Sequence, residues 1–146
     1  MFDHPVEHPS HYTAMSCVIE PIQLTGTMNG ALAQVLQYVL RHELKGTPKQ
    51  DLEKALFWAK WFRDRYFKQL QETTVPVQSS SASFEDVAIR EAWNQCFHCD
   101  NELTMRVVDI LTRCKELGRG DIDALILELE EELKDMELRH EDSSAY

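Results

Sequence analysis

The chain has 146 residues, of which 43% are hydrophobic, while glycine and proline contribute only five residues each. This hydrophobic content is enough for a core without disulfides. The scarcity of helix breakers, together with apolar spacings of three and four, favours an all-α fold. The formal net charge is −10, and residues 121–146 carry ten acids against two bases, so we expect neither nucleic acid nor a membrane as a partner.

The first predicted elements are an extended arm and a short helix. Residues 1–19 contain two prolines and a mixed composition, which favours an extended conformation. Glu20 followed by Pro21 is typical of a helix start, because the first helical turn does not use the N–H group that proline lacks. Gly26 and Gly30 should limit this helix to about two turns.

Two longer helices should follow and form an antiparallel hairpin, because only a short turn joins them. Asn29 is a suitable N-cap for the first helix, and Gly46 ends it. Thr47 and Pro48, with a glutamine three residues after the threonine, predict the start of the second helix, which should run to about Leu70. The expected buried stripes are Leu32, Val35, Leu36, Val39 and Leu40 in the first helix, and Leu52, Ala55, Leu56, Ala59, Phe62 and Tyr66 in the second.

The polar, serine-rich stretch over residues 73–83 is the clearest candidate for a linker. It predicts a division of the chain into a helical domain over residues 1–72 and a C-terminal helical region over 84–146. In this second region we expect helices over 84–98 and 101–117. The apolar stripe of the latter helix would be Leu103, Val107, Ile110, Leu111, Cys114 and Leu117.

The last predicted helix is amphipathic and acidic, with Asp121 as its cap. Its apolar residues alternate spacings of four and three, as in a coiled-coil seam of about two heptads. This seam consists of Ile122, Ile126, Leu129, Leu133 and Met136. Two interpretations stay open: the seam packs against the preceding helix within one chain, or it joins copies of the chain. We expect a homo-oligomer to which this helix contributes contacts.

The four cysteines are expected to be reduced thiols. No charged start followed by a long apolar run marks a secretion signal, so we expect a cytoplasmic protein with reduced thiols. Cys96 and Cys99 have the spacing of a redox or zinc site, but no second such pair accompanies them. Together with Cys17 and Cys114, they are therefore interpreted as structural thiols, and no metal site is predicted.

The sequence contains none of the common signatures of a P-loop, a Rossmann phosphate loop, a zinc protease or a serine hydrolase, so a nucleotide site would have to be built differently. Arg41 and Lys45 are four residues apart at a helix end that faces the helix start at 47–50. The free N–H groups of that start add positive potential, which makes the pair a candidate phosphate site. The alternative is ordinary compensation of the helix dipole by C-terminal cations.

Three histidines, His4, His8 and His11, precede the first helix. They lie among prolines, which favours a turn or a contact with an anion over a metal site. Tyr12 fits either a stacking surface or the core.

Four carboxylates on the last helix share one face: Glu128, Glu131, Glu132 and Asp135. They invite comparison with all-α nucleoside-triphosphate pyrophosphohydrolases, which hold magnesium between acidic pairs on two helices. No matching acidic pair lies upstream, so a solvated outer face is the favoured interpretation, and pyrophosphohydrolysis is only a third hypothesis.

Several short motifs occur in a distinctive order. They are His8-Pro9-x-His11-Tyr12, Ile19-Glu20-Pro21-Ile22, Tyr38-Val39-x-Arg41, Lys45-Gly46 and Asp51-Leu52-x-Lys54-Ala55, with Trp58 soon after. In this combination, residues 8–66 resemble a small bacteriophage family known as SaV-like proteins or phage nucleotide kinases. The resemblance implies a protein of the infected host cell that phosphorylates deoxynucleoside monophosphates without a P-loop. ATP or another nucleoside triphosphate would be the donor, with Mg²⁺ as a candidate cofactor.

The resemblance also implies a set of phosphate-handling residues. Arg41 and Lys45 would cradle phosphate, and His8 would belong to the same nucleotide-binding set. Lys54 would neutralise charge from the facing helix. His11 would contact phosphate or shuttle a proton, so Lys54 and His11 are the candidate catalytic residues.

Tyr12 and Tyr38 would hold the base, while Glu20 would bind ribose or orient a cation. The sequence departs from the family pattern at Gln23, where the family has an aspartate, and at Gln37, where it has a lysine. These losses favour altered specificity or binding without turnover. The alternative function is therefore a non-enzymatic protein that binds a nucleotide or a host protein, for example in regulation or to blunt a host defence.

Overall fold

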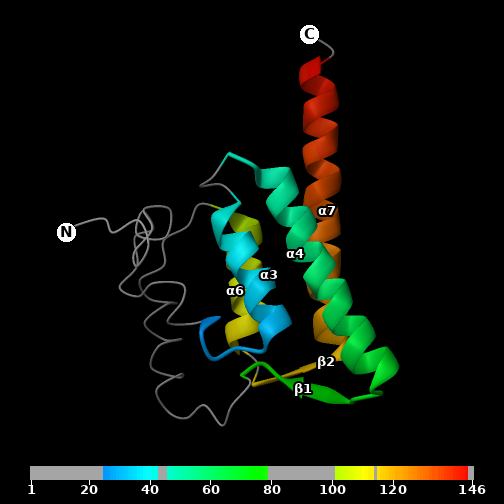
Figure 1. Cartoon of the computed structure of the whole chain (residues 1–146). Coiled ribbons are helices and arrows are strands. Elements are labelled where there is room, and N and C mark those ends of the chain that lie inside the picture. Colours follow the sequence, from blue (N-terminus) through cyan, green and yellow to red (C-terminus); the bar gives the residue numbers. More distant parts are fainter. Residues whose placement is uncertain (1–24, 43–45, 79–100, 114, 145–146) are drawn as a thin grey trace, which may run out of the picture.

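The structure of the protein is a computed structural model, and it describes residues 25–42, 46–78, 101–113 and 115–144. Its elements are α3 (Gly30–Arg41), α4 (Pro48–Phe62), η1 (Arg63–Gln69), β1 (Thr74–Pro76), α6 (Glu102–Arg113), β2 (Glu116–Gly118) and α7 (Arg119–Ser144). The described part is mostly helical, as the composition predicts, with one small antiparallel sheet at one end of the helices (Figure 1). Predictions for the arm, the helix after Pro21, the helix over 84–98 and all four cysteines lie outside the described residues.

The start of α3 follows the sequence prediction. The side-chain oxygen of Asn29 accepts hydrogen bonds from the backbone N–H groups of Ala31 at 3.0 Å and Leu32 at 3.4 Å. The Asn29 amide also donates to the hydroxyl of Tyr66 at 3.0 Å. This residue therefore caps α3 and ties it to η1. The predicted apolar stripe of α3 is buried along its whole length.

The start of α4 is also where it was predicted, with Thr47 at the N-cap position and Pro48 in the first turn. The pairing of Thr47 with Gln50, three residues later, predicts a capping box, and this prediction is wrong. The Thr47 hydroxyl makes no hydrogen bond to the backbone of the first turn and instead lies 3.3 Å from a carboxylate oxygen of Asp51, to which it donates. A buried carboxylate needs donors more than an exposed helix end does, because water can satisfy the exposed N–H groups.

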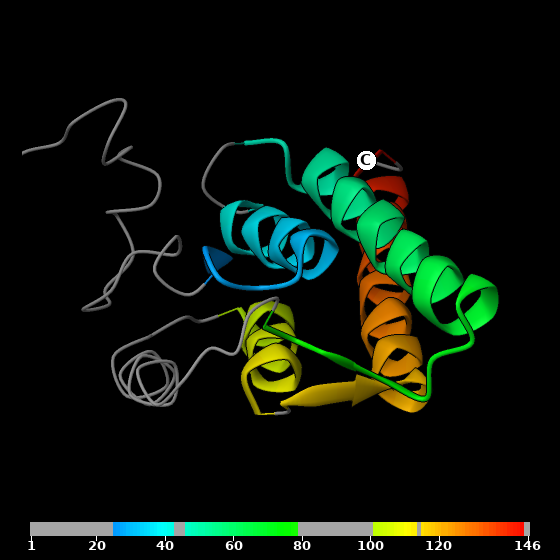
Figure 2. The same cartoon turned by 60° about the horizontal axis from the view of Figure 1, so that its bottom comes forward.

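Contacts between α3 and α4 confirm the predicted antiparallel hairpin. Tyr38 contacts Lys54, and Arg41 lies beside Asp51, so residues later in α3 meet residues earlier in α4. Figure 2 shows α3 beside α4 on one side and α6 on the other, while α7 packs against both α4 and α6. The four helices thus enclose the core.

The helix that begins at Pro48 continues beyond Phe62 as the π-helical segment η1, which agrees with the predicted end near Leu70. The N–H of Leu70 donates to the carbonyl of Arg65 at 3.0 Å, five residues back, where an α-helix would use the fourth. Gln71 follows with a left-handed φ of 53°, which turns the chain toward β1.

The linker prediction over residues 73–83 is wrong in its first part. β1 pairs with β2 in antiparallel register, with Val75 opposite Leu117. Val75 and Val77 are almost fully buried, whereas Thr74 is exposed. Alternating burial of this kind is typical of a strand with one face on the core. The two valines thus outweigh the polar composition around them.

The pairing of β1 and β2 also changes the predicted helix boundaries. α6 ends at Arg113, earlier than the predicted end at 117, because residues 116–118 form β2. α7 begins at Arg119, so Asp121 lies inside its first turn rather than at the N-cap. The Asp121 carboxylate accepts a hydrogen bond from the backbone N–H of Gly118 at 2.8 Å, which is the reciprocal half of a capping box.

The apolar seam of α7 is buried within the chain. Ile122 and Leu129 are fully buried, and Ile126 is nearly so. Leu133 and Met136 are partly buried against the same core. The intramolecular interpretation of the seam is therefore confirmed, because its residues are covered by their own chain. The homo-oligomer itself stays a prediction.

Ion pairs fix the direction of α7 against α4. Lys49 lies 3.8 Å from Glu137, and Lys60 lies 3.6 Å from Glu130. Later residues of α4 meet earlier residues of α7, so the two helices are antiparallel. Two acids of the C-terminal helix, Glu130 and Glu137, thus pair with bases of α4 while remaining substantially exposed.

One buried cluster joins the described residues on both sides of the predicted linker. Its largest fully buried side chains are Phe62, Leu32, Leu36, Leu52, Leu111, Leu117, Ile122, Leu125, Leu129, Val35 and Val39. They come from α3, α4, α6, β2 and α7, so these elements share a core. Among the described helices, none has the length and apolar character needed to cross a membrane.

Candidate anion-binding site

Three of the predicted site residues meet where the end of α3 faces α4. The guanidinium carbon of Arg41 lies 5.1 Å from the centroid of the Tyr38 ring, and the ammonium nitrogen of Lys54 lies 5.5 Å from it. Both distances are within the range of a cation–π contact. Tyr38 and Arg41 share a face of α3 because they are three residues apart, and the antiparallel hairpin brings Lys54 opposite them.

A buried carboxylate holds Arg41 in place. The Asp51 side chain is 1% exposed, and its Oδ1 lies 3.4 Å from Nε of Arg41. That nitrogen is buried without a well-aligned hydrogen bond, so the contact is an ion pair rather than a directed bond. The Arg41 side chain as a whole keeps a quarter of its surface exposed. Asp51 therefore anchors the guanidinium while part of it still faces outward.

The site has an excess of positive charge. Lys54 is exposed, and no acid of the described residues lies within 4 Å of its ammonium group. Arg41 and Lys54 thus contribute two positive charges against the single carboxylate of Asp51. Two cations held over one aromatic ring can bind an anionic group such as a phosphate, because each supplies several N–H donors.

The remaining predicted site residues are His8, His11, Tyr12, Glu20 and Lys45, and they lie outside the described residues. Their roles stay predictions. The prediction that Arg41 faces the start of α4 does agree with its contact to Asp51, which lies in the first turn of that helix.

A buried histidine fixes the end of α3 beside this site. His42 is 3% exposed, and its Nδ1 donates to the carbonyl of Val39. Its Nε2 then accepts from the amide nitrogen of Asn101 at 3.3 Å. Asn101 in turn accepts hydrogen bonds from the backbone N–H and the hydroxyl of Thr104 in α6. His42 is therefore a structural link between α3 and α6, next in sequence to Arg41.

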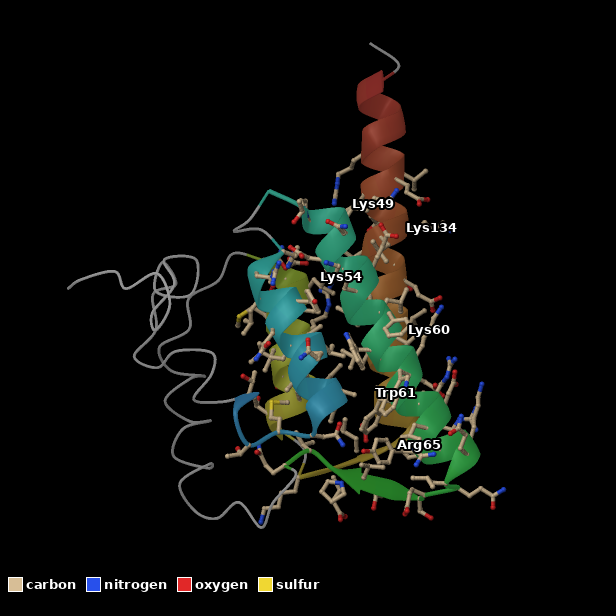
Figure 3. All side chains as sticks on the ribbon, in the orientation of Figure 1. Lys49, Lys54, Lys60, Trp61, Arg65 and Lys134 are labelled. Atoms are coloured by element: carbon tan, nitrogen blue, oxygen red, sulfur yellow. The ribbon has the colours of Figure 1, made fainter. Side chains whose placement is uncertain are left out.

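Sequence reasoning missed a second surface, on the outer side of α4 and η1. An open cavity of about 310 Å³ is lined there by Phe57, Lys60, Trp61, Asp64, Arg65 and Gln69. Phe57 is 59% exposed and Trp61 is 43% exposed. Figure 3 shows Lys54, Trp61 and Arg65 one after another along this helix. The available signal was the pair of large aromatic residues, four apart, on the face opposite the buried stripe.

Asp64 at this cavity is already neutralised by its neighbours. Its carboxylate lies 3.0 Å from Nε of Arg63 and 3.3 Å from the ammonium group of Lys68. The hydrogen bond from Arg63, with a further one from Lys68, lowers the pKa of Asp64 below its usual 3.8. The carboxylate thus adds little repulsion toward an anion in the cavity.

The acidic face of α7 is engaged in ion pairs at several points. Glu128 accepts a hydrogen bond from Arg106 at 2.7 Å, which raises the pKa of that arginine, and Glu132 accepts one from Arg139 at 3.1 Å. Glu130 pairs with Lys60, as described above. In the part of the chain that the structure describes, no group of three or more acidic, histidine or cysteine side chains is arranged to hold a metal ion.

Comparison with known proteins gives one match. A family model described as a protein of unknown function, DUF3310, matches residues 6–60. This range includes Tyr38, Arg41, Asp51 and Lys54 and ends just before Trp61. No curated protein and no solved structure matches the chain. The segment that carries the candidate anion-binding site is thus similar to DUF3310.

Proposed function

We propose that the protein binds a nucleotide through the phosphate at Arg41 and Lys54 and acts as a kinase of deoxynucleoside monophosphates without a P-loop. The observation that carries the phosphate site is the convergence of these two cations on the Tyr38 ring, with only one buried acid beside them. The nucleotide and the reaction are proposed from the resemblance of residues 8–66 to the phage kinases.

The proposed chemistry is a phosphoryl transfer, in which positioning and charge neutralisation supply most of the catalysis. An oxygen of the acceptor monophosphate attacks the γ-phosphorus of a nucleoside triphosphate. The new P–O bond forms while the bond to the bridging oxygen breaks, so two diphosphates result. Arg41, held by Asp51, would fix one phosphate. Lys54 would neutralise charge that develops during the transfer, and Mg²⁺ bound to the triphosphate would share this task.

For Tyr38 we propose a role other than the base contact that the resemblance implies. Since both cations lie over its ring, Tyr38 positions Arg41 and Lys54 rather than offering a free face to a base. Contact with the base would then fall to Tyr12, and proton transfer or a phosphate contact to His11, as the resemblance to the phage kinases implies.

A second candidate function is nucleotide binding without turnover. The carboxylate nearest to the two cations, Asp51, is 1% exposed and already engaged by Arg41 and Thr47. It is therefore poorly placed to activate an acceptor or to hold a metal ion. This observation favours a sensor, a nucleotide sponge or a host-protein binder if no product forms.

The test is to incubate the purified protein with each deoxynucleoside monophosphate and ATP or a deoxynucleoside triphosphate, and to separate the nucleotides by chromatography. New diphosphate derived from the monophosphate supports the kinase. Saturable binding of a nucleotide with no new product supports the second function. Neither binding nor product would refute both, and release of monophosphate from the triphosphate alone would point to the pyrophosphohydrolase.

Lys54→Ala is the better variant for testing the phosphate contact, because Arg41→Ala would also destabilise the fold by leaving the buried Asp51 without its ion-pair partner. Loss of a charged hydrogen bond to phosphate should weaken nucleotide binding by about 1–3 kcal/mol. Lys49→Ala is the matched control, since Lys49 is an exposed lysine on the same helix that pairs with an exposed glutamate. Equal affinities for the two variants would leave Lys54 as a plain surface charge.

A further inference from the structure

The cavity on the outer side of α4 and η1 has the features of a stacking site. Trp61 contacts Trp58 at 6.0 Å and Tyr66 at 6.4 Å between ring centroids, both in edge-on geometry. These contacts hold the indole while leaving 43% of the residue exposed. Phe57, one turn earlier, is exposed on the same side of the helix. Two large aromatic side chains therefore line an open cavity without covering each other.

Two basic side chains, those of Lys60 and Arg65, line the cavity beside these rings, and Asp64 is the one acid of its lining. Arg65 donates to the side-chain oxygen of Gln69 at 3.2 Å, and no acid of the described residues lies within 4 Å of its guanidinium. Lys60 lies on another side of the cavity, partly balanced by Glu130 at 3.6 Å. The surface thus offers an aromatic platform and a cation that is free to bind a ligand. This combination suits a planar aromatic molecule that carries negative charge.

The cavity lies on the same helix as the candidate anion-binding site. Lys54 precedes Trp61 by seven residues, which is about 10 Å along the helix axis. Seven residues are close to two full turns, so the two side chains project from neighbouring parts of one face. An extended ligand can therefore contact both.

We infer that this cavity is a second nucleotide subsite, in which the base of a nucleoside triphosphate stacks on Trp61 and the phosphates extend along α4 toward Lys54. Arg65 and Lys60 flank the base and sugar. The role of this nucleotide as phosphate donor rests on the proposed function, but its binding does not. A nucleoside triphosphate is favoured over a nucleic-acid strand because the aromatic surface spans only two rings, and the acidic α7 lies beside α4.

The test is to titrate ATP, and separately each deoxynucleoside triphosphate, into the full chain by calorimetry. Trp61→Ala and Phe57→Ala should both fold, since each side chain is substantially exposed; circular dichroism checks this. Trp61→Ala should weaken triphosphate binding by about five-fold or more, the lower limit of base–aromatic stacking. Leu127→Ala is the control, because Leu127 is an exposed apolar residue on α7 outside the cavity.

A parallel titration with deoxynucleoside monophosphates separates this inference from the proposed function. Monophosphate binding should depend on Lys54 and not on Trp61. Triphosphate binding that depends on Trp61, in a protein that forms no diphosphate, would support the subsite and refute the kinase. The subsite is overturned if no triphosphate binds, if neither aromatic substitution weakens binding, or if a short oligothymidylate binds through Trp61 more tightly than any triphosphate.

Discussion

Leu129 and Leu127 give a matched pair that tests how α7 is packed. Both are leucines on the same helix, but Leu129 is fully buried and Leu127 is 55% exposed. Replacing each with alanine removes the same atoms and changes helix propensity by the same small amount. The difference between the two variants therefore reports packing alone.

Leu129→Ala should lower the free energy of unfolding by about 2–5 kcal/mol, the range for a buried leucine that leaves a cavity. Leu127→Ala should change it by less than about 0.5 kcal/mol. The difference is large against the total stability of a small domain, which is about 5–15 kcal/mol. Urea unfolding followed by far-ultraviolet circular dichroism measures both values, provided that the slopes of the transitions agree.

Similar losses for the two variants would refute the packing of α7 described above. Light scattering on the same samples bears on the predicted homo-oligomer. Leu129→Ala should keep the mass of the unmodified chain while it remains folded, because its side chain is covered by its own chain. A lower mass without a loss of stability would restore the interpretation of the seam as an interface between copies.

Four further outcomes are expected from the fold. Asn29→Ala should cost about 1–2 kcal/mol of unfolding free energy, measured by urea, because it removes the cap of α3. Gln71→Gly should stabilise the chain by about 0.5–1 kcal/mol in the same assay, since glycine adopts a left-handed φ without strain. Asp64→Asn should cost less than about 1 kcal/mol at neutral pH, because the side chain is half exposed. Because the pKa of Asp64 is lowered in the folded chain, this difference in unfolding free energy should be present above pH 3.8 and vanish as the pH falls through the folded-state pKa. A difference that persists in acid would contradict the ion pairing. A fragment of residues 1–78 should show no cooperative thermal transition, because it lacks α7 and the partner of β1; a cooperative transition would argue for separate domains.

The sequence predicts those parts of the fold that depend on residues close together in the chain. Asn29 and Pro48 mark the starts of α3 and α4, and the spacing of apolar residues identifies their buried faces. β1 and β2 escaped prediction because each has three residues and the pairing joins Val75 to a residue 42 positions away. The alternating valines in TVPV are typical of a strand, but the serine-rich stretch that follows favoured a linker.

The candidate site shows the same division between local and tertiary information. Spacing on a helix predicts that Tyr38 and Arg41 share a face, and the short turn predicts that Lys54 comes near them. Nothing local predicts that Asp51 is buried and anchors Arg41, because burial depends on how α3 and α4 pack. The exposed pair of Phe57 and Trp61 was overlooked because large aromatic residues are usually assigned to the core.

The π-helical segment η1 makes chain length critical at one place. A π-helical turn holds more residues than an α-helical turn, so deleting one residue from η1 would let it return to α-geometry. In the present structure the wide π-helical turns place the Phe67 side chain in the core and the Tyr66 hydroxyl against Asn29. A deletion before Tyr66 would place one residue fewer ahead of both, and α-helical steps of about 100° would then return the two side chains close to the same directions. A deletion after Phe67 would keep the number of residues ahead of them in a tighter helix, which would turn both side chains away from these contacts. Natural variants that are one residue shorter in η1 should therefore have lost it on the N-terminal side of Tyr66.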